Sequence, residues 1–415
     1  MNIIVKANNL MEMDKVDEAL KLIRKQMTKA SDEELYWYAE FYLHWGFLVE
    51  AEEILSRLLI NYPEESELKL YLTDIYIEQD NDEKAIDLLN SIPKGDDAYL
   101  QALVALADLY QSQGLFEVAE QKLLQAKELN PSEPIIDLGL GELYYSFGDF
   151  KRAITFYEKA LKSDVHDIPI HERLAESYAN VGEYEVALTY YEKTDSKNPD
   201  VLFKYGVTAY QADRKDIAIH VWEELIEEDP YYHTAYMQLA KAYEDEELLN
   251  DAYETTLKGL KLDEFNKELY YLAGTLAHKC NLDVESEKHI REAVNLDMDY
   301  KEAVLFLIEL LKLKAKPEEI IELIRMVKEY GGDDPLYDWE IARAYIEIES
   351  YNDALNHYKE AYNSLQHDND FLKEYGYFLV EEGKSLEAIK VFTTYLEQDP
   401  QDDEIMEYVN RLKQM

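Results

Sequence analysis

A period of 34 residues runs through this sequence of 415 residues and limits the folds that it can adopt. Small residues, mostly Ala, recur with an apolar or aromatic residue four positions later, as in Ala119/Leu123. We call the recurring residue the marker, and nine of the eleven intervals between markers are 34 residues. The markers are Ala19, Ala51, Ala85, Ala119, Ala153, Ala187, Ala218, Ala252, Ser286, Ile320, Ala354 and Ala388. Such a period is typical of stacked repeats, each of which buries its apolar face against its neighbours.

Each repeat is predicted to form two helices, because its apolar residues recur three and four positions apart. Turn-forming residues such as Gln113-Gly114 separate the two helical stretches. A small residue stands twelve positions before most markers, as at Ala107, Gly141 and Gly376, and we expect close helix approach there. The pattern predicts an all-α solenoid of about twelve helix-turn-helix units, with a capping helix over residues 403–415.

This pattern resembles the tetratricopeptide repeat (TPR) family, and residues 106–131 carry the fullest match. Over its whole length the chain is similar to the long cytoplasmic TPR proteins of low-GC Gram-positive bacteria, of the YpiA-like type. The resemblance implies a right-handed superhelix whose concave groove is lined by the first helix of each hairpin. It also implies a scaffold or adaptor role without catalysis. The matching residues are Leu106, Ala107, Tyr110, Ala119, Leu123, Ala126 and Pro131.

The period shortens near the middle of the chain, where the interval between Ala187 and Ala218 is 31 residues. Pro199 lies in this shortened junction, directly before the next predicted helix. We therefore expect two arrays of about six repeats each, over residues 1–198 and 199–402. The junction either divides two functional halves or is a local kink without functional meaning.

One repeat, over residues 301–334, has bulky residues at both positions where small ones are expected, namely Ile308 and Ile320. Its helices are not expected to pack in the usual way. Residues 303–311 are apolar nearly all round. This stretch is therefore either unusually buried, which is the favoured interpretation, or exposed for self-association.

The charge of the chain bears on its partners. It has 88 acidic and 42 basic side chains and a formal net charge of −46, which repels phosphate backbones and anionic membranes. We therefore expect neither nucleic acid nor membrane as a partner. The acidity serves either the solubility of a long solenoid or the recognition of a basic partner. Cys280 is the single cysteine, and no signal peptide or apolar run of ~20 residues is evident, so a soluble cytoplasmic protein is expected.

No residue pattern indicates catalysis or metal binding. The nine His residues lack the His-Glu-x-x-His spacing, and neither a Walker glycine loop nor a Gly-x-Ser-x-Gly elbow is present. His278 and Cys280 stand two positions apart and would point to different sides of a helix. We predict that the chain is not an enzyme and has no cofactor and no metal site.

The family resemblance places ligand contacts on the first helix of each hairpin. We take the residue eleven positions before each marker to face the groove, and in five successive repeats it is acidic. Apolar and aromatic residues prevail four positions earlier on the same helix face. The predicted partner-binding groove consists of Tyr36, Glu40, Asp74, Asp108, Glu142, Tyr145, Glu176, Phe203, Tyr210, Tyr271 and Trp339.

These features predict a non-enzymatic scaffold or adaptor whose acidic and aromatic groove binds a peptide or helix of a partner protein, with Lys or Arg in the bound segment. The alternative is a regulatory or sensor subunit. Such a subunit would contact an enzyme or its own copy through an end or the convex face, or would bind a short signalling peptide. The chain itself is expected to be a monomer or a weak homodimer.

Overall fold

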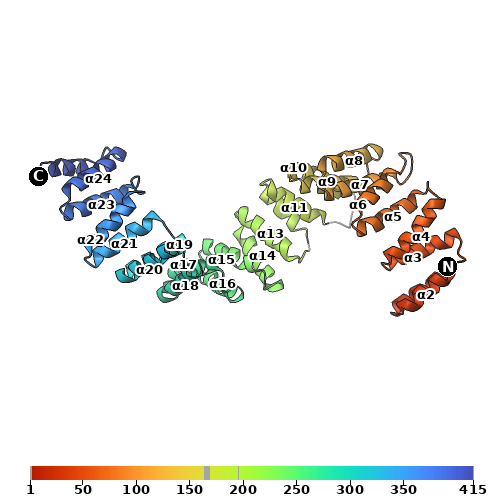
Figure 1. Cartoon of the computed structure of the whole chain (residues 1–415), viewed down its shortest axis with the longest axis horizontal. Helices are drawn as coiled ribbons and strands as arrows, with labels where there is room; N and C mark the ends of the chain where they lie inside the picture. Colours follow the sequence, from red (N-terminus) through yellow and green to blue (C-terminus); the bar gives the residue numbers. More distant parts are fainter. Residues whose placement is uncertain (1, 163–168, 195, 415) are drawn as a thin grey trace. The chain divides into compact units, whose positions relative to one another are not determined.

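The computed structural model describes residues 2–162, 169–194 and 196–414, which form 25 helices and contain no strand. The predicted all-α fold is therefore confirmed. The chain divides into two compact units, Met1–Ser196 and Lys197–Met415. The count of twelve repeats and the right-handed superhelix stay predictions. Within each unit the helices pack as consecutive hairpins that stack in sequence order (Figure 1).

The first unit contains the helices α1 to α12, which pair as α1 with α2 and so on to α11 with α12. Their bounds are α1 Asn2–Glu12, α2 Val16–Met27, α3 Asp32–His44, α4 Leu48–Asn61, α5 Ser66–Glu78, α6 Asp82–Asn90, α7 Tyr99–Ser112, α8 Phe116–Leu129, α9 Pro134–Ser146, α10 Phe150–Leu161, α11 Ile170–Asn180 and α12 Tyr184–Tyr191.

The second unit contains the helices α13 to α25, of which α25 packs on α24 and buries Ile405, Val409 and Leu412. Their bounds are α13 Pro199–Gln211, α14 Lys215–Glu228, α15 His233–Asp245, α16 Leu249–Leu262, α17 Lys267–Lys279, α18 Asp283–Leu296, α19 Lys301–Leu313, α20 Pro317–Glu329, α21 Pro335–Glu347, α22 Tyr351–Tyr362, α23 Asn369–Glu381, α24 Ser385–Gln398 and α25 Asp403–Leu412.

The turn inside each hairpin follows one design. A residue with positive φ stands five positions before each of the twelve markers, and five of these residues are Gly, as at Gly114. The next N–H donates back to the carbonyl of a helix residue, as from Leu115 to Tyr110 at 2.8 Å. This bond satisfies a carbonyl at the end of the first helix and reverses the chain, so the second helix folds back on the first.

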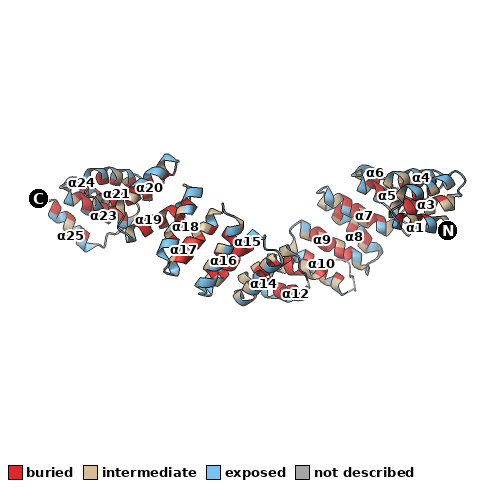
Figure 2. Cartoon of the chain, turned by 90° about the horizontal axis from the view of Figure 1, so that it is seen from below, coloured by how far each residue is buried: buried red, intermediate tan, exposed pale blue. Residues whose placement is uncertain are grey.

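Close helix approach depends on the small residues that the sequence repeats. A Cβ atom at Gly141 of α9 would lie 2.6 Å from a ring carbon of Tyr157 on α10, and the marker Ala153 is fully buried. A larger side chain at either position would therefore push the two helices apart. Figure 2 shows the buried residues on the inner faces of the hairpins. The same arrangement joins Gly206 with Trp222, Gly274 with Ile290 and Gly376 with Phe392.

The hairpin of α19 and α20 departs from this packing. Ile308 and Ile320 are at most 1 % exposed and occupy the two positions of which at least one is small in every other hairpin. Within the described residues, α19 and α20 pack less extensively than the two helices of any other hairpin. Six of the nine residues from 303 to 311 are buried, which confirms the favoured interpretation and argues against an exposed self-association patch.

Candidate functional site

Three of the five predicted groove carboxylates form an open acidic surface in the first unit. Glu40, Asp74 and Asp108 lie on α3, α5 and α7, which are the first helices of three successive hairpins. All three side chains are exposed. Within the described residues, none of them has a hydrogen bond or an ion pair. Three negative charges at one repeat position are therefore left without a cation of the chain itself.

The surroundings of two of these carboxylates raise their pKa. Burial by neighbouring protein atoms raises the pKa of Asp108, and burial followed by the charge of Glu78 raises that of Asp74. Both carboxylates are nevertheless reached by solvent. Partial desolvation by surrounding protein atoms raises the pKa of a carboxylate even where solvent still reaches it. The charged form of each is thus disfavoured and lacks a compensating partner.

Two tyrosines stand beside the open acidic surface. Tyr36 precedes Glu40 by one turn of α3, and Tyr71 precedes Asp74 by three residues on α5, so each ring shares a helix face with a carboxylate. The ring centroids of Tyr36 and Tyr71 are 5.9 Å apart in an edge-on arrangement, and their hydroxyls are 3.4 Å apart. Burial and the neighbouring Tyr71 hydroxyl raise the pKa of Tyr36. An aromatic pair therefore lies next to unpaired carboxylates.

The other two predicted carboxylates, Glu142 and Glu176, are neutralised inside the chain. The Nε of Arg173 donates to Glu142 at 3.0 Å, and its Nη1 lies 3.7 Å from Glu176. Tyr157 donates to Glu142 at 2.8 Å, and Tyr145 donates to Glu176, which is 6 % exposed. The predicted row of five carboxylates thus separates into three unpaired groups and two paired ones.

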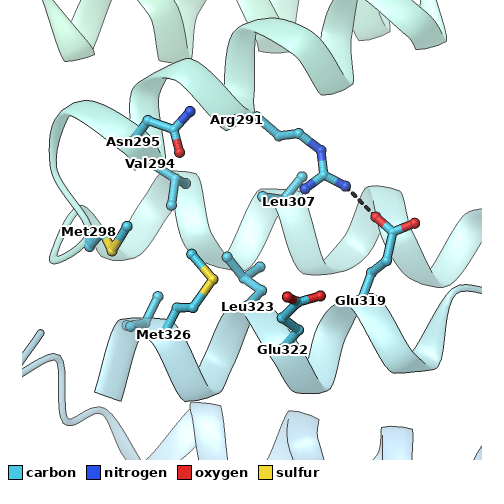
Figure 3. Close-up of a pocket in the computed structure, with 10 residues that line it drawn as sticks. Arg291, Val294, Asn295, Met298, Leu307, Glu319, Glu322, Leu323 and Met326 are labelled. Atoms are coloured by element: carbon cyan, nitrogen blue, oxygen red, sulfur yellow. Dashed lines mark hydrogen bonds and ion pairs between the residues drawn. The ribbon is translucent and has the colours of Figure 1, made fainter. Parts of the chain in front are cut away.

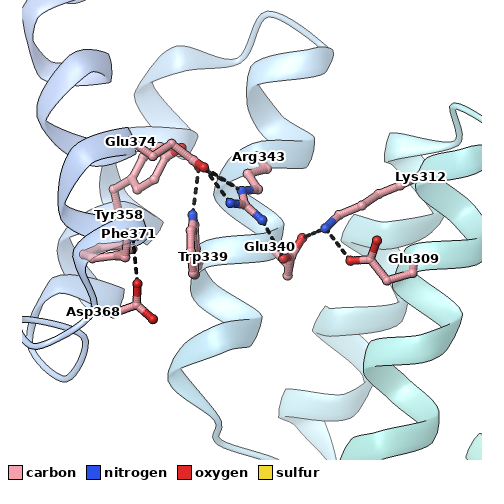
Figure 4. Close-up of polar contacts among 9 residues, drawn as sticks. All are labelled: Glu309, Lys312, Trp339, Glu340, Arg343, Tyr358, Asp368, Phe371 and Glu374. Carbon is pink, nitrogen blue, oxygen red and sulfur yellow. Dashed lines mark hydrogen bonds and ion pairs between the residues drawn. The ribbon is translucent and has the colours of Figure 1, made fainter.

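The second unit holds a paired cluster around Arg343 (Figure 4). Arg343 lies 4.0 Å over the ring of Trp339 and donates to Glu340 at 2.9 Å. Two of its nitrogens donate to Glu374, from Nη2 at 2.6 Å and from Nε at 2.8 Å. We define the paired cluster as Trp339, Glu340, Arg343, Tyr358 and Glu374.

Glu374 is the acceptor at the centre of the paired cluster. It also accepts from the indole N–H of Trp339 at 2.8 Å and from the hydroxyl of Tyr358 at 2.7 Å. Burial opposes ionisation, but the hydrogen bonds from Arg343, Tyr358 and Trp339 hold the pKa of Glu374 below its ordinary value. Trp339 is 7 % exposed and uses its single donor within the chain, so it presents little surface to a partner.

The remaining predicted aromatic residues are dispersed over the second unit. Tyr210 on α13 donates to Asp245, which together with burial raises its pKa to about 12. Phe203 packs on Tyr232 with ring centroids 5.3 Å apart, and Tyr271 packs on Tyr300 at the same separation. The structure does not bring these rings together into one site.

Two residues of these clusters, Arg173 and Glu374, are absent from the predicted groove because they lie three places before the groove position of their repeats, whereas the prediction rests on that position and the one four residues before it. Arg173 pairs with Glu142 and Glu374 pairs with Arg343, and both pairs are 31 residues apart. In each pair, the first residue occupies the groove position of its repeat. The second residue lies in the next repeat, three places before the groove position there. A search for opposite charges at 31-residue spacing would have found both pairs.

The described part of the chain also bears on metal binding, on thiol reactivity and on membrane insertion. No group of three His, Cys, Asp or Glu side chains there is placed to hold a metal ion. Burial raises the pKa of the Cys280 thiol, which disfavours the reactive thiolate. Among the described helices, none has the length and apolar character needed to cross a membrane.

Comparison with known proteins identifies the relatives of this chain. Residues 335–402 match the model of YpiA-like C-terminal tetratricopeptide repeats, and residues 111–165 match that of YpiA-like tetratricopeptide repeats. Residues 46–107 and 200–230 match general tetratricopeptide repeat models. The TPR repeat-containing protein YpiA of Bacillus subtilis (strain 168) is 38 % identical over 415 residues, which cover 99 % of this chain and 98 % of that protein.

Solved structures are more distant. The chain is similar to YrrB, described as a TPR protein with an unusual peptide-binding site, with 19 % identity, a TM-score of 0.39, and coverage of 44 % of this chain and 95 % of that one. It is also similar to the C-terminal part of a TPR repeat-containing protein from Cytophaga hutchinsonii. That match has 16 % identity, a TM-score of 0.49, and coverage of 56 % and 96 %.

Proposed function

Because this chain belongs to the YpiA-like family of tetratricopeptide repeat proteins, a non-catalytic protein-interaction fold, we propose that it is a scaffold that holds a Lys- or Arg-containing segment of a partner protein at the open acidic surface. Glu40, Asp74 and Asp108 are the proposed charge contacts. Tyr36 and the adjacent Tyr71 are the proposed aromatic contacts. Its cytoplasmic location and its monomeric or weakly dimeric state stay predictions.

One observation carries this proposal. Glu40, Asp74 and Asp108 are exposed and unpaired among the described residues, and the pKa of both aspartates is raised. A cation bound beside them would stabilise their charged form, since a nearby opposite charge offsets the cost of desolvation. Opposite charge also speeds encounter, while a packed aromatic ring adds affinity. Glu142, Glu176 and Trp339 are left out of the proposed contacts because they bond within the chain.

The test is capture of a partner by cross-linking, with wild-type chain and two triple variants. The groove variant is Glu40→Lys, Asp74→Lys and Asp108→Lys. The control is Glu53→Lys, Asp87→Lys and Glu117→Lys, which changes the net charge equally at exposed sites on α4, α6 and α8. We expect the groove variant to bind the captured segment more than ~10-fold more weakly and the control to bind it nearly as well as wild type.

Binding of the captured segment is also measured at increasing salt concentration, as a second test of the same site. Binding through exposed charges should weaken as ionic strength rises, because screening shortens the reach of each charge. Equal loss of binding in both triple variants would reduce the effect to net charge and would contradict the proposed site. A captured segment without Lys or Arg would contradict the proposed chemistry. Attachment through an end of the solenoid, as in the alternative function, would leave both variants active and the salt dependence weak.

A further inference from the structure

The helix α20 separates two hollows in the second unit, which are distinct from the open acidic surface. The first, of about 310 Å³, lies between α18 and α20 over Leu307 of α19 (Figure 3). The second, of about 530 Å³, lies on the other side of α20 and is bordered by Tyr345 and Ile348. Glu322 and Met326 of α20 line both. Volumes of this order are typical of sites that take up a ligand group.

The sequence explains why the hollows are here. Ile308 and Ile320 are both buried between α19 and α20, where the other hairpins have Gly, Ala or Ser at one or both positions. Their bulk holds α20 away from α19, and the looser packing of this hairpin leaves space beside α20. The irregular repeat therefore has a structural consequence on the surface.

The floor of the first hollow is apolar, and different side chains stand at its two ends. Val294, Leu307 and Val327 are at most 3 % exposed and form its base, and Leu323 is 8 % exposed. Figure 3 shows the Arg291–Glu319 ion pair at one end and the methionines Met298 and Met326 at the other. Methionine side chains adapt to varied apolar shapes, so this hollow suits an aliphatic or aromatic side chain.

The exposed face of α20 is acidic. Glu318, Glu322 and Glu329 are exposed and have no ion pair or hydrogen bond among the described residues. Arg325 is the opposing charge, and it donates to the neutral hydroxyl of Tyr345 at 2.5 Å. A net negative charge thus surrounds two apolar hollows.

We propose that the surface of α20 is a second docking surface, which takes a short segment of another protein with two apolar side chains and a Lys or Arg between them. One apolar side chain enters each hollow, and the cation lies over Glu322. A second copy of this chain is a poor occupant, because two chains of net charge −46 repel each other. An anionic membrane is excluded for the same reason. This surface is independent of the one proposed for the primary function.

The separation of the hollows sets the spacing of the apolar residues. They lie on opposite sides of one helix, whose diameter with side chains is ~10 Å. An extended segment spans that distance with about three residues at ~3.3 Å each. Segments with two apolar residues about three positions apart are therefore expected to bind best.

The experiment uses the full chain with ¹³C-methyl-labelled methionine, of which the sequence has nine. Short acetylated peptides of Lys, Ser and Gly, each with two Leu residues at varied separation, are the probes. We expect the methyl signals of Met298 and Met326 to shift, with the greatest effect at the separation stated above. The proposal would be overturned if the peptides shifted the methyl signals of other methionines instead, or if they shifted no methionine signal at millimolar concentration.

A matched pair of variants separates docking from general attraction. Glu322→Lys reverses the central charge of α20, whereas Glu254→Lys changes the equivalent position, two residues after the marker, on α16. Both side chains are exposed. Glu322→Lys should weaken the best peptide ~5-fold and Glu254→Lys should not. Equal weakening by both, or by neither, contradicts the proposed surface.

A variant that fills the first hollow gives a second and independent measurement. Asn295→Trp places an indole at its exposed edge without changing any charge. We expect loss of the Met298 shift and weaker peptide binding, with the helix content unchanged by circular dichroism. Unaltered peptide binding by this variant would show that the hollow is not used.

Discussion

The open acidic surface of the first unit and the paired cluster of the second use the same repeat positions, yet only the second is neutralised within the chain. In the second unit, Arg343 occupies the groove position, and Glu374 stands 31 residues later to pair with it. In the first unit, the residues 31 places after Glu40, Asp74 and Asp108 are Tyr71, Ala105 and Gly139, none of which carries a charge. The residue in the next repeat thus decides whether the groove position is satisfied or free.

Two further cases show that the cation can come from the next repeat or from the same helix. Glu142 in the first unit has Arg173 at the corresponding place and is paired. Glu309 in the second unit faces Glu340 across that spacing, and Lys312 pairs with both of these carboxylates. A groove charge is therefore neutralised wherever a cation is supplied from the neighbouring positions. Ion pairs between adjacent repeats stabilise the packing of those repeats, whereas unpaired charges leave a surface for a partner.

The largest effect is expected from breaking the paired cluster. Arg343→Met leaves Glu374 with Trp339 and Tyr358 as its remaining donors. We expect a loss of about 2 kcal/mol, less than the ~3–5 kcal/mol of a fully buried pair, because the Arg343 and Glu374 side chains are 33 % and 34 % exposed. Hydrogen exchange of α21 to α23 measures this loss locally.

The control for that substitution is Arg325→Met on α20. Its guanidinium donates to the neutral hydroxyl of Tyr345, and Arg325 is exposed. We expect its effect to stay within ~0.5 kcal/mol, as for most surface substitutions. Equal losses in the two variants would mean that the cluster contributes no more than any surface arginine.

A smaller effect is expected from closing the open acidic surface. Ala105→Arg places a cation 31 residues after Asp74, which is the relation between Glu142 and Arg173. The new pair should raise stability by up to ~1 kcal/mol and weaken the captured partner segment ~5-fold, because one of three carboxylates is then neutralised. Ala105→Met, which adds a long side chain without charge, is the comparison. Equally strong partner binding by the Arg and Met variants would contradict the role of Asp74.

The sequence predicts the solenoid and its hairpins well because the period, the turn residues and the small packing positions all agree. Even the exceptional repeat is anticipated, since Ile308 and Ile320 stand where Gly141 and Ala153 stand elsewhere. The space beside α20 results from the way in which these two bulky side chains pack between α19 and α20. The repeat pattern carries no information about that packing. For the same reason the row of five carboxylates is predicted as uniform, although Glu176 is buried beside Tyr145 and Asp74 is exposed. Whether a carboxylate is paired depends on which side chains lie beside it in the folded chain.

The smallest effect is the pH dependence, which has opposite signs in the two regions. The pKa of Glu374 is lowered in the folded chain, so its contribution to stability is present above the ordinary value and is lost as the pH falls through the folded value. The pKa of Asp74 and Asp108 is raised, so their charge opposes folding at neutral pH, and this cost decreases as the pH falls through their folded values. Carboxyl-carbon NMR titration should therefore place the midpoint of Glu374 below, and those of the aspartates above, the ordinary range.

Asp108→Asn should increase stability slightly at neutral pH, within ~0.5 kcal/mol, and lose that advantage in acid. If saturating the surface with the captured segment left the aspartate midpoints unmoved, no cation would be bound beside them, and the contrast between the two regions would have no functional meaning.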